Sequence, residues 1–326
     1  MILLSTLLLS IFVTMALIPV FNRLAARLHA LDVPDWRKVH SQPIPRTGGL
    51  AMAIGTLASA FLWMRPDSFT HAYLIGAGII VTLGILDDTR GVDYWVKFAG
   101  QLAAALVMLF LGGIKIKALG TLLPEAVMLP DWLAIPLTLL IIVGVTNAIN
   151  LADGLDGLAG GICLLSLSCI GYLAYLEGNT LVLLLALSLS GAIFGFLRFN
   201  TYPATVFMGD TGSQLIGFSL IALALNFTQG RTPLSPLLPL LIIGFPLLDT
   251  ATVIARRVLG PGVVSYRSRI GDLPAAGRFR DRCTRVPVLL GLVHSLGIRF
   301  RLARLSRGIG SRRAKAVAPE TQGHSG

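Results

Sequence analysis

Nine apolar runs, each close to the length of a membrane-spanning helix, dominate the sequence. Hydrophobic residues make up 54% of the 326 residues and charged residues only 13%, whereas a soluble domain carries about 25% charged residues. A helix needs about 20 residues to cross a bilayer, so a soluble globular protein is excluded. We predict an all-α, polytopic transmembrane helix bundle, with spans at residues 2–21, 48–64, 70–86, 94–112, 132–150, 158–176, 180–197, 212–229 and 233–255.

The net charge of +11 comes from one end of the chain. Residues 1–255 hold 12 Lys or Arg and 13 Asp or Glu, a net charge of −1, while residues 256–326 hold 15 and 3, a net charge of +12. Such a tail suits an anionic cytoplasmic leaflet or topology anchoring. Because no aromatic-rich RNA-binding pattern accompanies it, no nucleic-acid partner is expected. We therefore divide the chain into a transmembrane domain, 1–257, and an atypical Arg-rich cytoplasmic tail, 258–326.

The placement of Lys and Arg in the short loops predicts the orientation of the spans. Alternate loops are rich in basic residues, as in the segment that holds Arg23, Arg27 and Arg46, and the other loops hold few. Basic loops stay on the cytoplasmic side. Nine spans then place the N-terminus outside and the basic tail inside, so the tail agrees with the count.

Acidic and amide residues gather at the span ends that face the cytoplasm. Carboxylates brought together with few basic partners repel one another unless a cation neutralises them. We therefore expect these helix ends to converge on one site that binds a cation. The residues concerned are Asp87, Asp88, Asn147, Asn150, Asp153, Asp156, Asp210 and Asp249.

The strongest local pattern is the segment 147–161. Asn147, Asn150, Asp153 and Asp156 recur every three residues, so a continuous helix would align them in a polar ridge. Four glycines in the segment would allow a phosphate or another backbone to approach closely. A helix break with capping residues is the alternative.

Two further patterns carry carboxylates. Asp87-Asp88 ends the third span, and the next span holds Lys97. Adjacent carboxylates raise each other's proton affinity, which suits a general base or a metal partner, but such a pair alone is also commonplace as a solvated turn. Asp210 precedes the eighth span. It could cap that helix or bind a hard divalent cation beside a helix end that favours phosphate.

Two other segments are candidates for phosphate or ion contacts. The turn Pro45-Arg46-Thr47-Gly48-Gly49 opens the second span, where Arg46 and unbonded backbone amides could hold a phosphate, or Arg46 could simply anchor the topology. Asp249 lies inside the ninth span. An acid within a membrane is a functional candidate by default, but pairing with Arg256 or Arg257 is an equal alternative.

Together these motifs resemble the polyprenyl-phosphate N-acetylhexosamine-1-phosphate transferases, in the branch that uses undecaprenyl phosphate and N-acetylglucosamine. The similarity spans roughly residues 30–257, in the family's order. It rests on Pro45–Gly49, Leu86–Asp88 with Lys97 and Gln101, Asn147–Gly161, Phe207–Ser213 and Pro246–Asp249.

The resemblance implies a Mg²⁺-dependent reaction, with Mn²⁺ as a possible substitute, in the cytoplasmic membrane. A polyprenyl phosphate attacks the β-phosphorus of a UDP-N-acetylhexosamine, releases UMP and forms a lipid-diphosphate sugar for cell-envelope polysaccharides. A homodimer is implied by resemblance alone. The resemblance assigns catalytic roles to Asp87, Asp88, Asp153 and Asp156, the metal to Asp210, and substrate binding to Arg46, Thr47, Lys97, Asn147, Asn150, Phe207 and Asp249, with the Phe207 ring stacked on uracil.

One departure from the family pattern affects the tail. Members carry a His-x-His-His motif after the ninth span, but this chain has no histidine between His71 and His294. Replacement of the lost contacts by arginines, a shifted reading frame after about residue 260, and an inactive homologue that binds lipid phosphate or nucleotide are three explanations. A membrane transporter is a further alternative, although carriers place their acids near the bilayer midplane.

Overall fold

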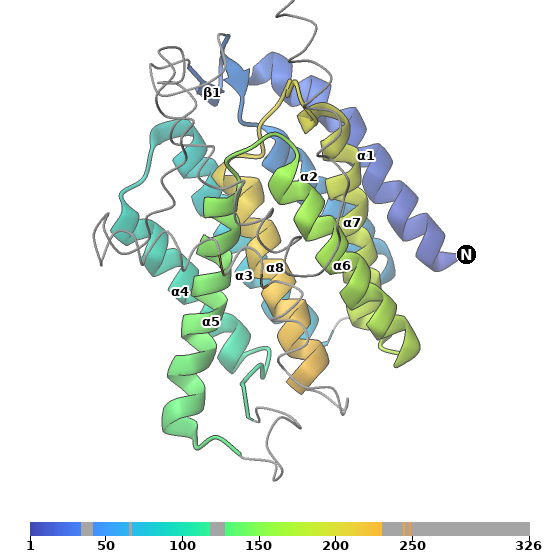
Figure 1. Ribbon diagram of the computed structural model, residues 1–326, viewed down its shortest axis with the longest axis vertical. Coiled ribbons are helices and arrows are strands. Elements are labelled where there is room, and N and C mark those ends of the chain that lie inside the picture. The colour runs from blue at the N-terminus through green and yellow to red at the C-terminus, as the bar shows by residue number, and fades with distance from the viewer. Residues whose placement is uncertain (34–41, 65–66, 118–127, 230–243, 245–247, 249–326) are drawn as a thin grey trace, which may run out of the picture. The chain divides into compact units, whose positions relative to one another are not determined.

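A computed structural model describes residues 1–33, 42–64, 67–117, 128–229, 244 and 248 of the chain. Within those residues it is almost entirely helical, with eight helices arranged side by side (Figure 1). They are α1 (Ile2–Leu24), α2 (Gly48–Trp63), α3 (Ser68–Arg90), α4 (Tyr94–Phe110), α5 (Asp131–Ala152), α6 (Leu158–Leu176), α7 (Thr180–Asn200) and α8 (Gly209–Gln229).

These eight helices correspond to the first eight predicted spans. Six of them are long and apolar enough to cross a membrane, and the apolar helices α2 and α4 are shorter, with 16 and 17 residues. The helical membrane architecture is therefore confirmed. The ninth span, 233–255, and the basic tail lie outside the described residues, so the count of nine stays a prediction.

A two-stranded sheet is the exception to the predicted all-α fold. Strand β1 (Leu31–Asp32) pairs antiparallel with β2 (Ile44–Pro45), with Leu31 opposite Pro45. The ribbon closes the loop between α1 and α2. It delivers the chain into the Arg46-Thr47 turn at the start of α2.

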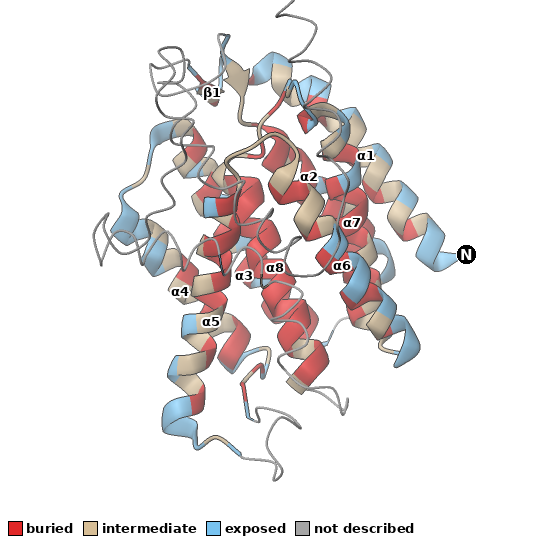
Figure 2. Ribbon diagram, in the orientation of Figure 1, coloured by how far each residue is buried: buried red, intermediate tan, exposed pale blue. Residues whose placement is uncertain are grey.

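Helix α8 is the centre of the bundle. It packs against α3, α5, α2, α6 and α7, and Figure 2 shows it buried along almost its whole length. Even the polar side chains of Ser213 and Gln214 in its first turns are buried, at 1% and 2% exposure. Groups at the N-terminal end of α8 are therefore held by neighbouring helices.

Glycines allow the neighbouring helices to reach the α8 backbone. A Cβ built on Gly49 of α2 would lie 2.1 Å from the backbone nitrogen of Gly212, and one built on Gly84 of α3 would lie 2.4 Å from the Cα of Thr211. Small residues at such crossings let helix backbones approach closely in membranes. The result is that the ends of α2 and α3 converge on the N-terminus of α8.

Candidate active site

Lys97 lies between two carboxylates at the converged helix ends. Its Nζ is 2.5 Å from Oδ2 of Asp87, in the last turn of α3, and 2.8 Å from Oδ2 of Asp210, in the first turn of α8. The predicted convergence of the acidic span ends is thus confirmed for Asp87 and Asp210. Among the described residues, it is Lys97 that supplies the positive charge between them.

Asp88 points to a different partner from its neighbour Asp87. Oδ1 of Asp88 accepts a hydrogen bond from the backbone N–H of Asp210 at 2.8 Å. Oδ2 accepts from the backbone N–H and the hydroxyl of Thr211, at 3.0 and 2.6 Å. Although the sequence assigned the same role to both residues of the pair, only Asp87 contacts the Lys97 ammonium.

A chain of amides supports the Asp210 side chain. Gln214 Nε2 donates to Asp210 Oδ2 at 3.3 Å, and Gln214 Oε1 accepts from Gln101 Nε2 at 3.1 Å. Gln101 Oε1 in turn accepts from Asn147 Nδ2 at 2.6 Å. Gln101 is 3% exposed, so the chain is buried and holds Asp210 in a fixed direction.

The predicted polar ridge on residues 147–156 is only half formed. Helix α5 ends at Ala152, and Asp153 is the residue that caps it, with φ −75° and ψ 59°. Asn147 and Asn150 still project from the same side of the helix, where Asn150 Nδ2 donates to Ser213 Oγ at 3.0 Å. The prediction of one continuous ridge is wrong, because the capping alternative applies from residue 153 onward.

Asp153 remains near the other acids although the helix has ended. Loss of hydration, followed by repulsion from Asp210, Asp88 and Asp156, raises its pKa from 3.8 to about 7. Asp153 therefore gains and loses its proton near neutral pH. This carboxyl group is one whose charge a bound cation would stabilise.

The raised pKa of Asp153 predicts how stability depends on pH. Between about pH 4 and 7 the folded protein holds a proton that the unfolded chain has released, so the free energy of unfolding falls as the pH rises through this window. We expect the melting temperature in detergent and chelator to fall between pH 5 and pH 8. The fall should be shallower for Asp153→Asn, measured in parallel; equal slopes for the two proteins would contradict the assignment.

Asp156 and Asn200 fasten the loop between α7 and α8. Oδ2 of Asp156 accepts from the backbone N–H of Ala204 at 3.1 Å. Asn200 Oδ1 accepts from the N–H of Gly157 at 2.9 Å, and its Nδ2 donates to the carbonyl of Val206 at 2.9 Å. Sequence reasoning missed Asn200, since a single asparagine at the end of an apolar run carries no pattern. It is 3% exposed, and it ties the α5–α6 turn to the segment before Phe207.

The backbone N–H groups of Gly48 and Gly49 in the turn at residues 45–49 bond to carbonyls of the protein, so they are not free to bind a phosphate. The N–H groups of Gly48 and Gly49 donate to the carbonyls of Phe207 and Met208, at 3.1 and 2.9 Å, and the N–H of Phe207 donates to the carbonyl of Pro45 at 2.7 Å. The expectation that these amides are unbonded is wrong, because the turn pairs with the 207–208 backbone. The motif therefore fixes the segment that carries Phe207.

The side chains of the same turn also have protein partners. Arg46 forms an ion pair with Asp32 of β1, and the Thr47 hydroxyl donates to Asn22 Oδ1 at 2.8 Å. The Arg46 side chain remains 37% exposed, so its outer face stays accessible to an anion. Asp249, the remaining sequence candidate, lies outside the described residues.

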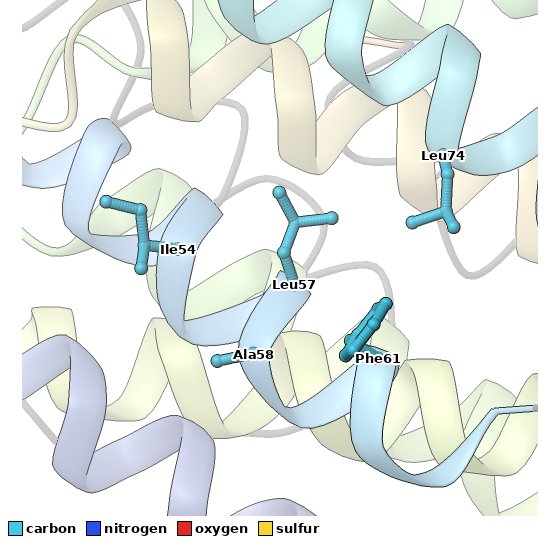
Figure 3. A pocket seen from close by; sticks show the side chains of 5 residues that line it. All are labelled: Ile54, Leu57, Ala58, Phe61 and Leu74. Carbon is cyan, nitrogen blue, oxygen red and sulfur yellow. The ribbon is translucent and has the colours of Figure 1, made fainter.

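An apolar pocket of about 460 Å³ lies on α2 and α3 (Figure 3). Its lining has no polar group that could bind a phosphate or a metal, and Phe61 within it is 86% exposed. It is therefore a different feature from the carboxylate site. The lining residues are Ile54, Leu57, Ala58, Phe61 and Leu74.

Comparison with known proteins assigns the chain to a family. Residues 70–228 match glycosyl transferase family 4, and a relative from Bacillus subtilis (strain 168) is 40% identical over 88% of this chain and 81% of its own length. The chain belongs to glycosyl transferase family 4 and is a multi-pass membrane protein.

The relatives have consistent names. The Bacillus subtilis protein is described as a probable undecaprenyl-phosphate N-acetylglucosaminyl 1-phosphate transferase. The undecaprenyl-phosphate alpha-N-acetylglucosaminyl 1-phosphate transferase of Escherichia coli (strain K12) is 34% identical over 90% of this chain and 83% of its own. The decaprenyl-phosphate N-acetylglucosaminephosphotransferase of Mycobacterium leprae is 35% identical over 72% of this chain and 67% of its own.

Proposed function

We propose that this protein transfers N-acetylglucosamine 1-phosphate from UDP-N-acetylglucosamine to undecaprenyl phosphate or a similar polyprenyl phosphate. The products are UMP and a lipid-diphosphate sugar. Membership of glycosyl transferase family 4 and the names of three relatives support this reaction. The structural observation that carries the proposal is the Asp87–Lys97–Asp210 cluster at the converged helix ends.

The reaction needs positive charge between two anionic substrates. A phosphate oxygen of the lipid forms a bond to the β-phosphorus of the donor, and the bond between that phosphorus and the oxygen bridging to UMP breaks. Lys97 is the central cation of the cluster, and Asp87 holds its Nζ at 2.5 Å. In this role Lys97 contacts a substrate phosphate and Asp87 orients the ammonium.

The donor groups around Asp210 are suitable for Mg²⁺. Asp87 and Asp210 offer carboxylate oxygens, the hard ligands that Mg²⁺ prefers, and the Gln214 amide nitrogen donates to Asp210 Oδ2 and orients that carboxylate. Among the described residues, no three His, Cys, Asp or Glu side chains form a ready metal site. The proposed Mg²⁺ would instead be held by one or two carboxylates together with substrate phosphates. Bound there, Mg²⁺, or Mn²⁺ in its place, would neutralise charge on the phosphate oxygens.

The other candidates fit around this centre. The Phe207 ring is proposed to stack on uracil, since the turn 45–49 fixes its backbone. Asn150 and Asp153 are proposed to line the nucleotide pocket, next to the α8 terminus. Asp156 contributes indirectly, through its hydrogen bond to the loop before Phe207.

We further propose that the site faces the cytoplasm across a cell inner membrane. The basic loops predict this orientation, with the N-terminus outside and the basic tail inside. UDP-sugars would then reach the carboxylates from the cytoplasm while the polyprenyl chain lies in the bilayer. A homodimer remains a proposal from family resemblance.

An inactive homologue that binds lipid phosphate or nucleotide is the second candidate. The observation that favours it is the lack of histidine between His71 and His294, where the family motif is expected. If the protein is instead an active enzyme, we propose that Arg267, Arg269 or Arg278, which lie in the corresponding stretch, replaces the lost phosphate contacts. The two candidates differ in turnover but not in binding.

The decisive experiment measures UMP release from purified protein in detergent. We expect release from UDP-N-acetylglucosamine that requires both undecaprenyl phosphate and Mg²⁺ and that stops on addition of a chelator. UDP-N-acetylgalactosamine and UDP-glucose serve as donor controls. Mg²⁺-dependent binding of UDP-N-acetylglucosamine without UMP release would instead identify the inactive homologue.

A further inference from the structure

We infer that Asp88 is a positioning residue that caps helix α8 from helix α3, and that it acts on the reaction by setting the direction of Asp210. This assignment goes beyond the proposed function and rests on it for its effect on turnover. It separates Asp88 from Asp87, which contacts Lys97 directly.

The N-terminus of α8 lacks a cap of its own. The first N–H groups of any helix have no partner within the helix, and a Ser, Thr, Asp or Asn just before the helix normally binds one of them. Here that position is held by Gly209, whose φ of +70° is not helical and which has no side chain to accept a hydrogen bond. The backbone N–H groups of Asp210 and Thr211 donate instead to the carboxylate of Asp88, which lies 122 and 123 residues away in the sequence.

The geometry of Asp88 is that of a structural cap. Both carboxylate oxygens are engaged by α8, one by the Asp210 amide and the other by the amide and hydroxyl of Thr211. The residue is 8% exposed. A general base must reach the proton that it removes, whereas the hydrogen bonds of Asp88 fix the backbone of the residue that carries the Asp210 carboxylate.

Gly209 makes the contact possible. Its φ of +70° is a backbone conformation that residues other than glycine rarely adopt. A Cβ at this position would also lie 2.6 Å from Oδ2 of Asp88. Gly209 therefore turns the chain into α8 and leaves room for a carboxylate from α3 against the helix end.

The consequence concerns the metal site. Asp210 is held in two ways. Its backbone N–H donates to Asp88, and its carboxylate accepts from Lys97 and Gln214. Weakening the cap lets the first turn of α8 move, so the Asp210 oxygen is less well placed for a cation. Loss of Asp88 should therefore weaken cation binding while the pH dependence of the reaction stays unchanged.

The test measures Mn²⁺ binding by electron paramagnetic resonance, together with the Mg²⁺ concentration that gives half-maximal UMP release. We expect Asp88→Asn to weaken Mn²⁺ binding about 10- to 100-fold, the size of a lost hydrogen bond to a charged group, and to raise the Mg²⁺ requirement similarly. At saturating Mg²⁺ the pH profile should keep the wild-type shape. Loss of its acidic limb would show that Asp88 is a base and overturn the inference.

A second pair of variants tests the cap without changing a charge. Thr211→Val removes the hydroxyl that donates to Asp88, and Thr211→Ser restores it, so the first should weaken Mn²⁺ binding and the second should recover most of it. Thr82→Val is the control, because Thr82 is an exposed residue of α3 whose hydroxyl bonds only within its helix. The double variant Asp88→Asn/Thr211→Val should weaken binding no more than about threefold beyond Asp88→Asn, since the two groups share one interaction.

The result separates the cap from the proposed function. Wild-type protein that binds Mn²⁺ but releases no UMP would remove the proposed function and leave the cap testable by metal binding. Unchanged Mn²⁺ affinity in both Asp88→Asn and Thr211→Val would overturn the cap, whatever the activity. The cap would also be overturned if the loss of Mn²⁺ affinity in the double variant equalled the product of the losses in the two single variants.

Discussion

Asp210→Asn is expected to lower the turnover number for UMP release by a factor of about 10²–10³, the usual loss when one electrostatic stabiliser is removed from an active site. Asparagine has nearly the same shape as aspartate and keeps an oxygen for the amide of Gln214. It removes the negative charge 2.8 Å from the Lys97 ammonium. The loss should therefore come from charge and metal binding and not from a disturbed fold.

The measurement is UMP release at saturating substrates over a range of Mg²⁺ concentrations. Asp131→Asn is a matched control, because Asp131 also pairs with a lysine, Lys115, but lies at the other end of the bundle with 73% of its side chain exposed. The control should keep wild-type turnover and Asp210→Asn should melt within a few degrees of it. Normal turnover by Asp210→Asn would remove Asp210 from the mechanism.

The sequence predicted the helices and the meeting of their ends because both depend on regular patterns. Apolar runs of bilayer length mark the spans, and acids at alternate span ends must lie on one side of the membrane. Those rules predicted that Asp87 and Asp210 meet, whereas the position of Lys97 between them is seen only in the structure. The contacts at 2.5 and 2.8 Å agree with them.

The partners of individual site residues could not be predicted because they depend on which helices pack together. The pairing of Asp88 with the α8 amides requires α3 to lie against α8, and the pairing of Gly48 with Phe207 requires α2 to meet the α7–α8 loop. No sequence pattern states either contact. For the same reason Asn200 was missed, since its two loop contacts exist only in the folded protein.

The end of α5 shows a further limit. A three-residue spacing predicts a ridge only while the helix continues, and the helix ends at Ala152. Asp153 therefore faces the other acids from a turn, and Asp156 binds the N–H of Ala204. Asp153 thus stays near the other acids, but the separate contacts of Asp153 and Asp156 follow from the turn and not from a helical ridge.

The second large effect is expected at the crossing of α2 and α8. Gly49→Ala would place a Cβ 2.1 Å from the backbone nitrogen of Gly212 and 2.6 Å from the carbonyl oxygen of Met208. Both are backbone atoms that no side-chain rotation can move. Overpacking usually lowers the free energy of unfolding by about 1–3 kcal/mol, and we expect a loss in the upper part of this range or beyond it. The measurements are the melting temperature in detergent and the yield of folded protein, both of which should fall.

Gly78→Ala is the matched control for this prediction. Gly78 also lies within a helix, α3, but a Cβ there would meet nothing within 4 Å, and alanine favours a helix over glycine by about 1 kcal/mol. Its stability should therefore stay level or rise. Because Gly49 also donates its amide to Met208, any folded Gly49→Ala protein should bind UMP more weakly than Gly78→Ala, since the displaced turn no longer fixes the Phe207 segment. Equal melting temperatures and equal UMP binding for the two variants would show that the α2–α8 crossing is looser than its geometry indicates.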